Sequence, residues 1–155
     1  MAEDLDRRAT TRLGPYHPAL PPRALMLVLD ASVAVPACGT PEGFDLFGEE
    51  ELVAPPLLWS ESRSALHEAM WRREISRAQS ERSLVALETA PIRVRTPRAL
   101  GRTAWELATD LGWAKTYDAE YVALAQLLRC RLVTLDRRLR RGADRLGFVL
   151  LLSEL

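Results

Sequence analysis

The feature that most constrains the fold is a series of short apolar runs, each separated from the next by a segment with helical periodicity. Met26–Leu29 is the first such run, and residues 132–135 form another. Four apolar residues without polar alternation are typical of strands that are buried on both faces in a parallel sheet. Strands that alternate with helices predict an α/β fold, a three-layer α/β/α sandwich with a mainly parallel central sheet.

The same patterns predict where each element lies. We expect strands over residues 26–29, 52–54, 92–95, 132–135 and 148–150. We expect helices over residues 57–75, 77–89 and 136–145, and two more that begin after Pro97 and at Asp118. Between the first two strands the sequence indicates only a short turn around Gly39, because Pro41 and Gly43 follow closely.

The length of 155 residues suits one domain. Residues 1–25 contain four prolines and no apolar period, so we expect a flexible N-terminal extension, followed by the folded domain over residues 26–155. No run reaches the roughly 18 apolar residues of a membrane span, and we expect a cytoplasmic protein without membrane contact. The 21 basic and 21 acidic residues balance, so bulk charge alone predicts no attraction to nucleic acid.

Four acidic residues stand where a parallel sheet would bring them together. Asp30 and Asp136 each end an apolar run, and ligands bind outside the carboxyl ends of parallel strands. Asp118 begins a predicted helix, where a capping role is the alternative. Glu61 lies on the inward stripe of its helix with Leu58, and no lysine or arginine shares that stripe within one turn.

A buried carboxylate costs several kcal/mol unless it is paired or bound to a metal ion. Taken singly, each of these acids is more often a helix cap or a surface charge than a ligand. Four carboxylates that converge without cations would repel one another and raise one another's pKa values. This repulsion favours a divalent ion among them. Oxygen ligands select Mg²⁺ or Mn²⁺ over zinc.

The segments around these acids carry a family resemblance. LVLDASVAV, SESRSAL, TYDAEYVALA and LVTLDRRL resemble the four motifs of PIN-domain proteins, in the family's order and spacing, over residues 26–155. Toxin ribonucleases of the VapC type are the most similar members. The chain departs from the pattern in its long segment before Met26 and at Leu128-Arg129-Cys130, where relatives often have a glycine between helix and strand.

The resemblance implies a Mg²⁺- or Mn²⁺-dependent endoribonuclease, normally a homodimer that is neutralised by a cognate antitoxin. By position, the acids that match the catalytic and metal-binding residues are Asp30, Glu61, Asp118 and Asp136. Ser32 and Thr134 match small hydroxyl positions where an oxygen can hold a carboxylate or a water molecule.

Basic residues beside the last motif predict a surface for RNA. The candidates are Arg137, Arg138, Arg140, Arg141 and Lys115. A solvated helix face or an antitoxin-binding face is the alternative for the arginines. Trp113 and Tyr117 precede Asp118 and could stack on unpaired bases, although packing within the loop would equally explain Trp113.

Two other functions fit a PIN-like fold. One is a housekeeping PIN nuclease in RNA processing, against which the small size and the lack of appended domains argue. The other is a non-catalytic interaction module, against which the presence of all four acids argues. A short antitoxin reading frame immediately upstream would favour the toxin.

Overall fold

The computed structural model describes residues 26–155, so the expected extension over residues 1–25 lies outside the described residues. It contains one five-stranded sheet in the order β3-β2-β1-β4-β5, and every neighbouring pair is parallel. The strands are β1 (Met26–Leu29), β2 (Glu51–Ala54), β3 (Ile92–Val94), β4 (Arg131–Thr134) and β5 (Val149–Leu151). The predicted parallel sheet is confirmed.

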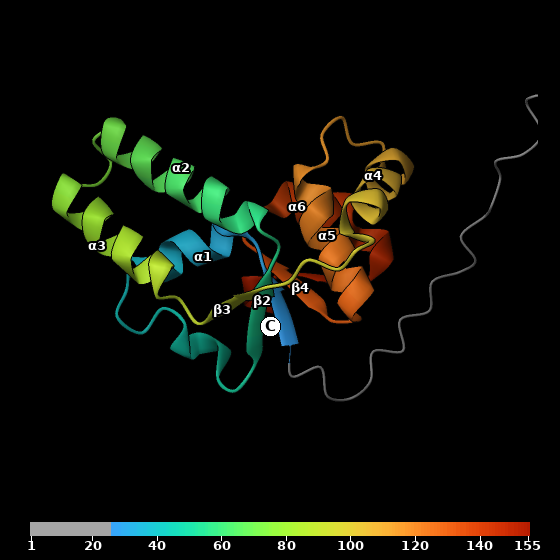
Figure 1. Cartoon of the computed structure of the whole chain (residues 1–155), viewed down its shortest axis with the longest axis horizontal. Helices are drawn as coiled ribbons and strands as arrows, with labels where there is room; N and C mark the ends of the chain where they lie inside the picture. The colour runs from blue at the N-terminus through green and yellow to red at the C-terminus, as the bar shows by residue number, and fades with distance from the viewer. Residues whose placement is uncertain (1–25) are drawn as a thin grey trace, which may run out of the picture.

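Helices cover both faces of the sheet (Figure 1). They are α1 (Ala31–Cys38), α2 (Leu57–Trp71), α3 (Arg77–Glu88), α4 (Leu100–Leu111), α5 (Tyr117–Leu128) and α6 (Arg137–Gly142). Short 3₁₀ turns follow at Asp45–Phe47, Asp144–Leu146 and Leu152–Glu154. Helix α5 packs on β1 and β4, whereas α6 contacts β4 and β5; α2 and α3 form a hairpin on α1. The predicted three-layer sandwich is therefore also confirmed.

The central strand explains why the first apolar run has no polar residue. Leu27 and Val28 pair with β2 on one side and with β4 on the other. Both side chains, and that of Leu29, have no exposed surface. A strand that is covered on both faces by helices buries every side chain, so the period-two alternation of a half-exposed strand is absent.

Several predicted boundaries are wrong, and one helix was missed. The turn predicted around Gly39 is preceded by helix α1, whose sequence lacks an amphipathic period and contains Pro36. Helix α2 ends at Trp71 instead of residue 75, because Arg73 adopts a left-handed conformation with φ 61°. The fourth strand ends at Thr134, one residue earlier than expected.

The predicted helix over residues 136–145 is also shorter than expected. Helix α6 stops at Gly142, and a 3₁₀ turn over Asp144–Leu146 follows. The capping residue Ala143 has φ −105° and ψ 8°, outside the helical region, and it is completely buried. Packing of Ala143 into the core thus ends the helix.

The strand order creates a crevice at one edge of the sheet. The chain runs from β1 outward to β2 and β3, and then crosses back to β4 and β5 on the other side of β1. The connections after β1 and β4 therefore leave in opposite directions from adjacent strands, which is where ligands bind in open α/β sheets. Across residues 26–155, no helix has both the length and the hydropathy to span a bilayer.

The end of helix α5 yields a prediction about stability. Arg129 caps this helix with φ 54°, in the left-handed region that glycine adopts without strain. We expect Arg129→Gly to raise the free energy of unfolding by about 1 kcal/mol, measured by urea denaturation. Arg129→Ala is the control, since it shortens the side chain without relieving the backbone. Equal stability of the two variants would contradict the prediction.

Candidate active site

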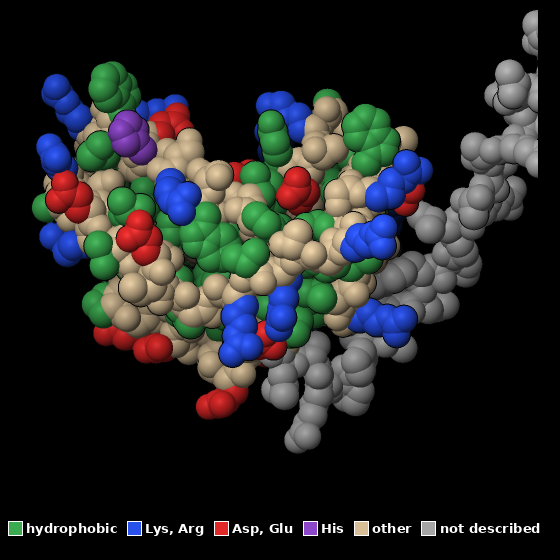
Figure 2. Space-filling model, viewed as in Figure 1, with side chains coloured by type: hydrophobic (Ala, Val, Ile, Leu, Met, Phe, Trp, Pro, Cys, Tyr) green, Lys and Arg blue, Asp and Glu red, His purple; other side chains and the backbone are tan. Residues whose placement is uncertain are grey.

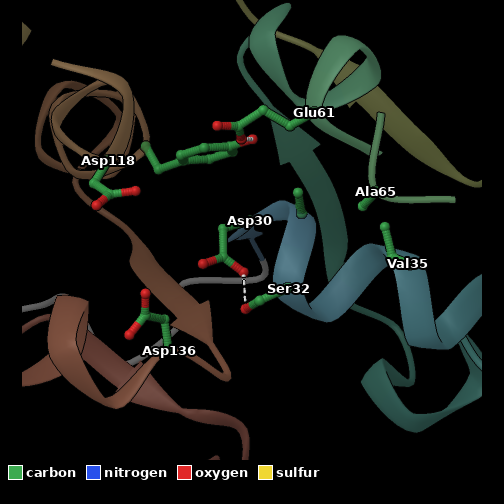
Figure 3. Close-up of a pocket in the computed structure, with 9 residues that line it drawn as sticks. Asp30, Ser32, Val35, Glu61, Ala65, Asp118 and Asp136 are labelled. Atoms are coloured by element: carbon green, nitrogen blue, oxygen red, sulfur yellow. Dashed lines mark hydrogen bonds between the residues drawn. The ribbon is translucent and has the colours of Figure 1, made fainter. Parts of the chain in front are cut away.

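One pocket of about 330 Å³ brings the four predicted acids together. It opens into the hollow between the α2–α3 hairpin and the α4–α6 side of the molecule (Figure 2). Figure 3 shows the carboxylates of Asp30, Glu61, Asp118 and Asp136 around a common space. Asp30 follows β1, Glu61 lies on α2, Asp118 is in the first turn of α5, and Asp136 precedes α6. Among residues 26–155, no lysine or arginine lines this pocket.

Two hydroxyl groups hold the carboxylate of Asp30. Ser32 Oγ donates a hydrogen bond to Asp30 Oδ1 at 2.6 Å, and Thr134 Oγ1 donates one to Asp30 Oδ2 at 2.6 Å. The backbone N–H of Val33 adds a longer bond at 3.3 Å as α1 begins. Asp30 is only 6% exposed, so these donors replace most of the water that its charge would otherwise bind.

The same two hydroxyls tie together the segments that follow β1 and β4. Ser32 Oγ accepts the backbone N–H of Leu135 at 2.8 Å, and Thr134 Oγ1 accepts that of Asp136 at 2.9 Å. Each hydroxyl thus accepts one bond from the β4–α6 connection and donates one to Asp30. This network fixes the position of Asp136 relative to Asp30.

Glu61 has a hydrogen-bond partner that the sequence did not reveal. Tyr121 on α5 donates its phenolic O–H to Glu61 Oε2 at 2.5 Å, and Tyr121 itself is 1% exposed. In the sequence, Tyr121 stands on the apolar face of its helix, with Val122 and Ala125. A buried tyrosine nearly always bonds its hydroxyl, so a tyrosine on an otherwise apolar face was the available signal.

The predicted position of Glu61 needs a correction. Helix α2 buries Leu58, Ser62 and Leu66 against the core, whereas Glu61 is only half-buried. Glu61 therefore lies beside the inward stripe and not on it. Its carboxylate faces the pocket, where burial is partial and Tyr121 supplies one hydrogen bond.

Asp136 and Asp118 differ in the hydrogen bonds that their carboxylates accept. Asp136 caps α6, because its Oδ1 accepts the backbone N–H groups of Arg138 at 2.6 Å and Leu139 at 3.3 Å. Asp118 does not cap α5, since Thr116 occupies the N-cap position, and the capping alternative for Asp118 is wrong. Among the described residues, no hydrogen bond reaches either oxygen of Asp118 or Oδ2 of Asp136.

Burial and charge raise the pKa of three of these carboxyl groups. Burial contributes most to the raised pKa of Asp30, Glu61 and Asp118. The charge of Asp118 also raises the pKa of the other two, and Asp136 does the same to Asp118. Arg138 acts against this and lowers the pKa of Asp118. The predicted mutual repulsion does raise these pKa values, but burial raises them more.

The donor set fits a divalent cation in charge and in atom type. All four side chains offer oxygen, and no lining cation offsets them. Within residues 26–155, however, no three acidic, histidine or cysteine side chains stand close enough to hold one ion together as they are placed. Binding of one ion would therefore bring these side chains closer together. The oxygens that accept no hydrogen bond among the described residues are both of Asp118, Oε1 of Glu61 and Oδ2 of Asp136.

The basic residues are divided among three environments. Lys115 and Arg138 line a second cleft that shares Asp118 and Asp136 with the acidic pocket. Arg137 and Arg141 are exposed and line neither cleft.

Arg140 forms ion pairs within the fold. Its guanidinium pairs with Asp144 and with Glu154, at 2.9 Å for the latter, and its side chain is 23% exposed. The first partner lies one helical turn away and the second at the chain's C-terminal turn. Both ion pairs lie within the fold, so a contact of Arg140 with RNA, which stays a prediction, would compete with them.

The raised pKa of Asp118 predicts how stability depends on pH without metal. When a carboxyl pKa is higher in the folded state, the folded protein binds more protons, so stability falls as pH rises from the unfolded value of about 3.9 through the folded one. Asp118→Asn should therefore stabilise the protein in EDTA at pH 7, and the gain should vanish at pH 3.5.

Urea denaturation at the two pH values measures this effect. Asp110→Asn is the matched control, because Asp110 is an exposed aspartate on α4 that does not line the acidic pocket. A wild-type protein that is more stable than Asp118→Asn at pH 7 would contradict the account.

The Tyr121–Glu61 bond predicts an energetic coupling between α5 and α2. Tyr121→Phe should lower the free energy of unfolding by about 1–2 kcal/mol, because a hydrogen bond to a charged group is lost and Glu61 keeps its charge. In a Glu61→Gln background the same change should cost less. A double-mutant cycle measures the coupling, and additive effects would show that the bond contributes nothing.

Comparison with known proteins identifies the family of this chain. The sequence profile of the PIN domain matches residues 27–145. Over 115 residues the chain is 35% identical to "VapC ribonuclease Mb0985" of Mycobacterium bovis and to "Ribonuclease VapC9" of Mycobacterium tuberculosis, covering 74% of this chain and 88% of each relative. The crystal structure of PAE2754 from Pyrobaculum aerophilum shares the fold, with a TM-score of 0.67 and 22% identity over 84% of this chain and 91% of that one. The chain belongs to the PIN domain family.

Proposed function

We propose that the protein is a metal-dependent endoribonuclease that acts as the toxin of a VapBC-type toxin–antitoxin pair. The observation that carries the proposal is a pocket lined by four carboxylates and by no basic residue. Two relatives that match most of this chain are named ribonucleases of the VapC type, which supports RNA as the substrate. Cellular RNA as the target fits the cytoplasmic location that the sequence predicts.

The cation would be Mg²⁺ or Mn²⁺, with Asp30, Glu61, Asp118 and Asp136 as its ligands, directly or through water. When bound there, the ion supplies Lewis-acid activation for phosphodiester hydrolysis and offsets the charge of the pocket. The protein's own groups prepare the ligands. Ser32 and Thr134 hold both oxygens of Asp30, and Tyr121 holds one oxygen of Glu61. Both oxygens of Asp118, Oε1 of Glu61 and Oδ2 of Asp136 accept no hydrogen bond among the described residues and are left for an ion.

The substrate must approach a pocket that repels it. A phosphodiester is anionic, so four carboxylates would exclude it unless cations nearby compensate. Lys115 and Arg138 stand beside the pocket, and the exposed Arg137 and Arg141 add attraction at longer range. We propose that these four residues guide the RNA backbone toward the acids.

We also propose that the protein forms a homodimer and is held inactive by a cognate antitoxin, as the resemblance implies. Large apolar side chains on the α2–α3 hairpin support a contact surface there. Trp71 is 79% exposed and Val85 60% exposed, and exposed apolar groups of this size are common at protein interfaces. Residues 26–155 would form the complete nuclease domain, so a chain that starts at Met26 should suffice for chemistry.

The proposed function predicts metal-dependent cleavage that requires Glu61. The purified protein should cleave single-stranded RNA with Mg²⁺ or Mn²⁺ and stop in EDTA. Glu61→Gln should reduce the cleavage rate about 100-fold or more, because several kcal/mol of transition-state stabilisation depend on the ion.

The control is Glu68→Gln on the same helix, which removes an exposed carboxylate that pairs with Arg72 outside the pocket. This variant should cleave RNA like the wild type. Cleavage that survives rigorous chelation, or a folded Glu61→Gln protein with full activity, would refute the proposal. A protein that binds RNA but never cuts it would favour the non-catalytic module.

A further inference from the structure

A second cleft lies directly beside the acidic pocket. It has a volume of about 480 Å³, within the range of about 300–1,000 Å³ that is usual for small-ligand sites. Its walls come from the α4–α5 connection on one side and from α6 on the other. Asp118 and Asp136 line both spaces, so the two clefts adjoin each other at these residues.

The second cleft adds two basic side chains to the two carboxylates that it shares with the acidic pocket. Lys115 from the α4–α5 connection and Arg138 from α6 line it together. Both side chains are exposed, and no ion pair within residues 26–155 engages either of them. The charge of Arg138 reaches the acidic pocket, because it lowers the pKa of Asp118. An anionic group in this cleft would therefore meet two unpaired cations next to the acids.

The cleft also contains an aromatic side chain that packs against a neighbouring helix. Trp113 lines it, and the indole ring packs against Gly142 of α6. A Cβ atom at residue 142 would lie 3.0 Å from Trp113 Cζ2 and 3.1 Å from Nε1, so glycine is what lets the ring lie this close to the helix. Trp113 is half-buried, which leaves part of the ring open to the cleft.

We propose that this second cleft binds the ribonucleotide that adjoins the scissile phosphodiester, with Lys115 and Arg138 pairing with its phosphate and Trp113 contacting its base. The inference rests on the proposed ribonuclease function and adds a substrate subsite to it. Two cations and one aromatic ring match the two parts of a nucleotide, because unpaired bases stack on aromatic side chains and phosphates pair with lysine and arginine. An acidic protein segment would use the cations but would leave the indole without a matching group.

Kinetics of the Mg²⁺-loaded full chain on a short single-stranded RNA test the phosphate contacts. Lys115→Gln and Arg138→Gln should each raise KM about tenfold and flatten its dependence on salt, with a smaller change in kcat. Arg141→Gln is the matched comparison, because it removes the same charge from the same helix outside both clefts. The factor by which Arg141→Gln raises KM should be at least three times smaller than the factor for Arg138→Gln. Equal KM values for these two arginine variants would overturn the proposal.

Tryptophan fluorescence tests the base contact without requiring cleavage. Binding of the same RNA in EDTA should quench emission in the wild type and much less in Trp113→Phe. Trp105→Phe is the control, since Trp105 is 65% exposed on α4 and lines neither cleft; it should keep the quenching. Gly142→Ala, which changes no charge, should displace the indole ring and weaken RNA binding. Quenching that persists in Trp113→Phe would overturn the base contact.

The two readouts separate failure of the subsite from failure of the function. If the wild type cleaves no RNA with either metal, the proposed function fails, and the fluorescence measurement still decides whether the cleft binds RNA. If RNA is cleaved with unchanged KM by Lys115→Gln and Arg138→Gln while these variants lose their antitoxin, the cleft is a protein-binding surface and the inference is wrong.

Discussion

The rest of the site depends on how Asp30 is held. Its carboxylate is nearly buried, and it lies at the junction of two adjacent strands whose connections diverge. Ser32 and Thr134 each donate a hydrogen bond to it and each accept one from the segment that leads to Asp136. The charge is therefore kept in place by groups that also fix the geometry around it. The resulting network joins the two halves of the sheet at the edge where the pocket opens.

The two clefts differ in the charged side chains that line them. The chain has no net charge, yet four carboxylates line one pocket and two unpaired cations line the next. In the acidic pocket, burial and repulsion raise the pKa of Asp30, Glu61 and Asp118. A divalent cation bound in this pocket would offset the repulsion among the carboxylates. Arg138 already reduces it at Asp118, whose pKa it lowers.

Local patterns predicted the strands and, through the geometry of a parallel sheet, the meeting of the four acids, but they did not predict which other side chains bond to these acids and to the arginines. Asp30 was predictable because it directly follows a run of buried apolar residues. Tyr121 was not, because its bond to Glu61 joins two helices that are 60 residues apart in sequence. The ion pair of Arg140 with Glu154 was not predictable either, because the two residues are 14 positions apart in sequence and meet only in the fold. Helix α1 was missed because its small apolar residues have no period and Pro36 suggests a break.

The central claim is that the four carboxylates of this pocket share a divalent cation. Anomalous diffraction from a crystal soaked in Mn²⁺ tests it most directly. The account predicts an anomalous peak among Asp30, Glu61, Asp118 and Asp136, and no such peak in a crystal of Asp30→Asn. A protein that cleaves RNA with Mn²⁺ but shows its peak elsewhere, or none in this pocket, would contradict the account.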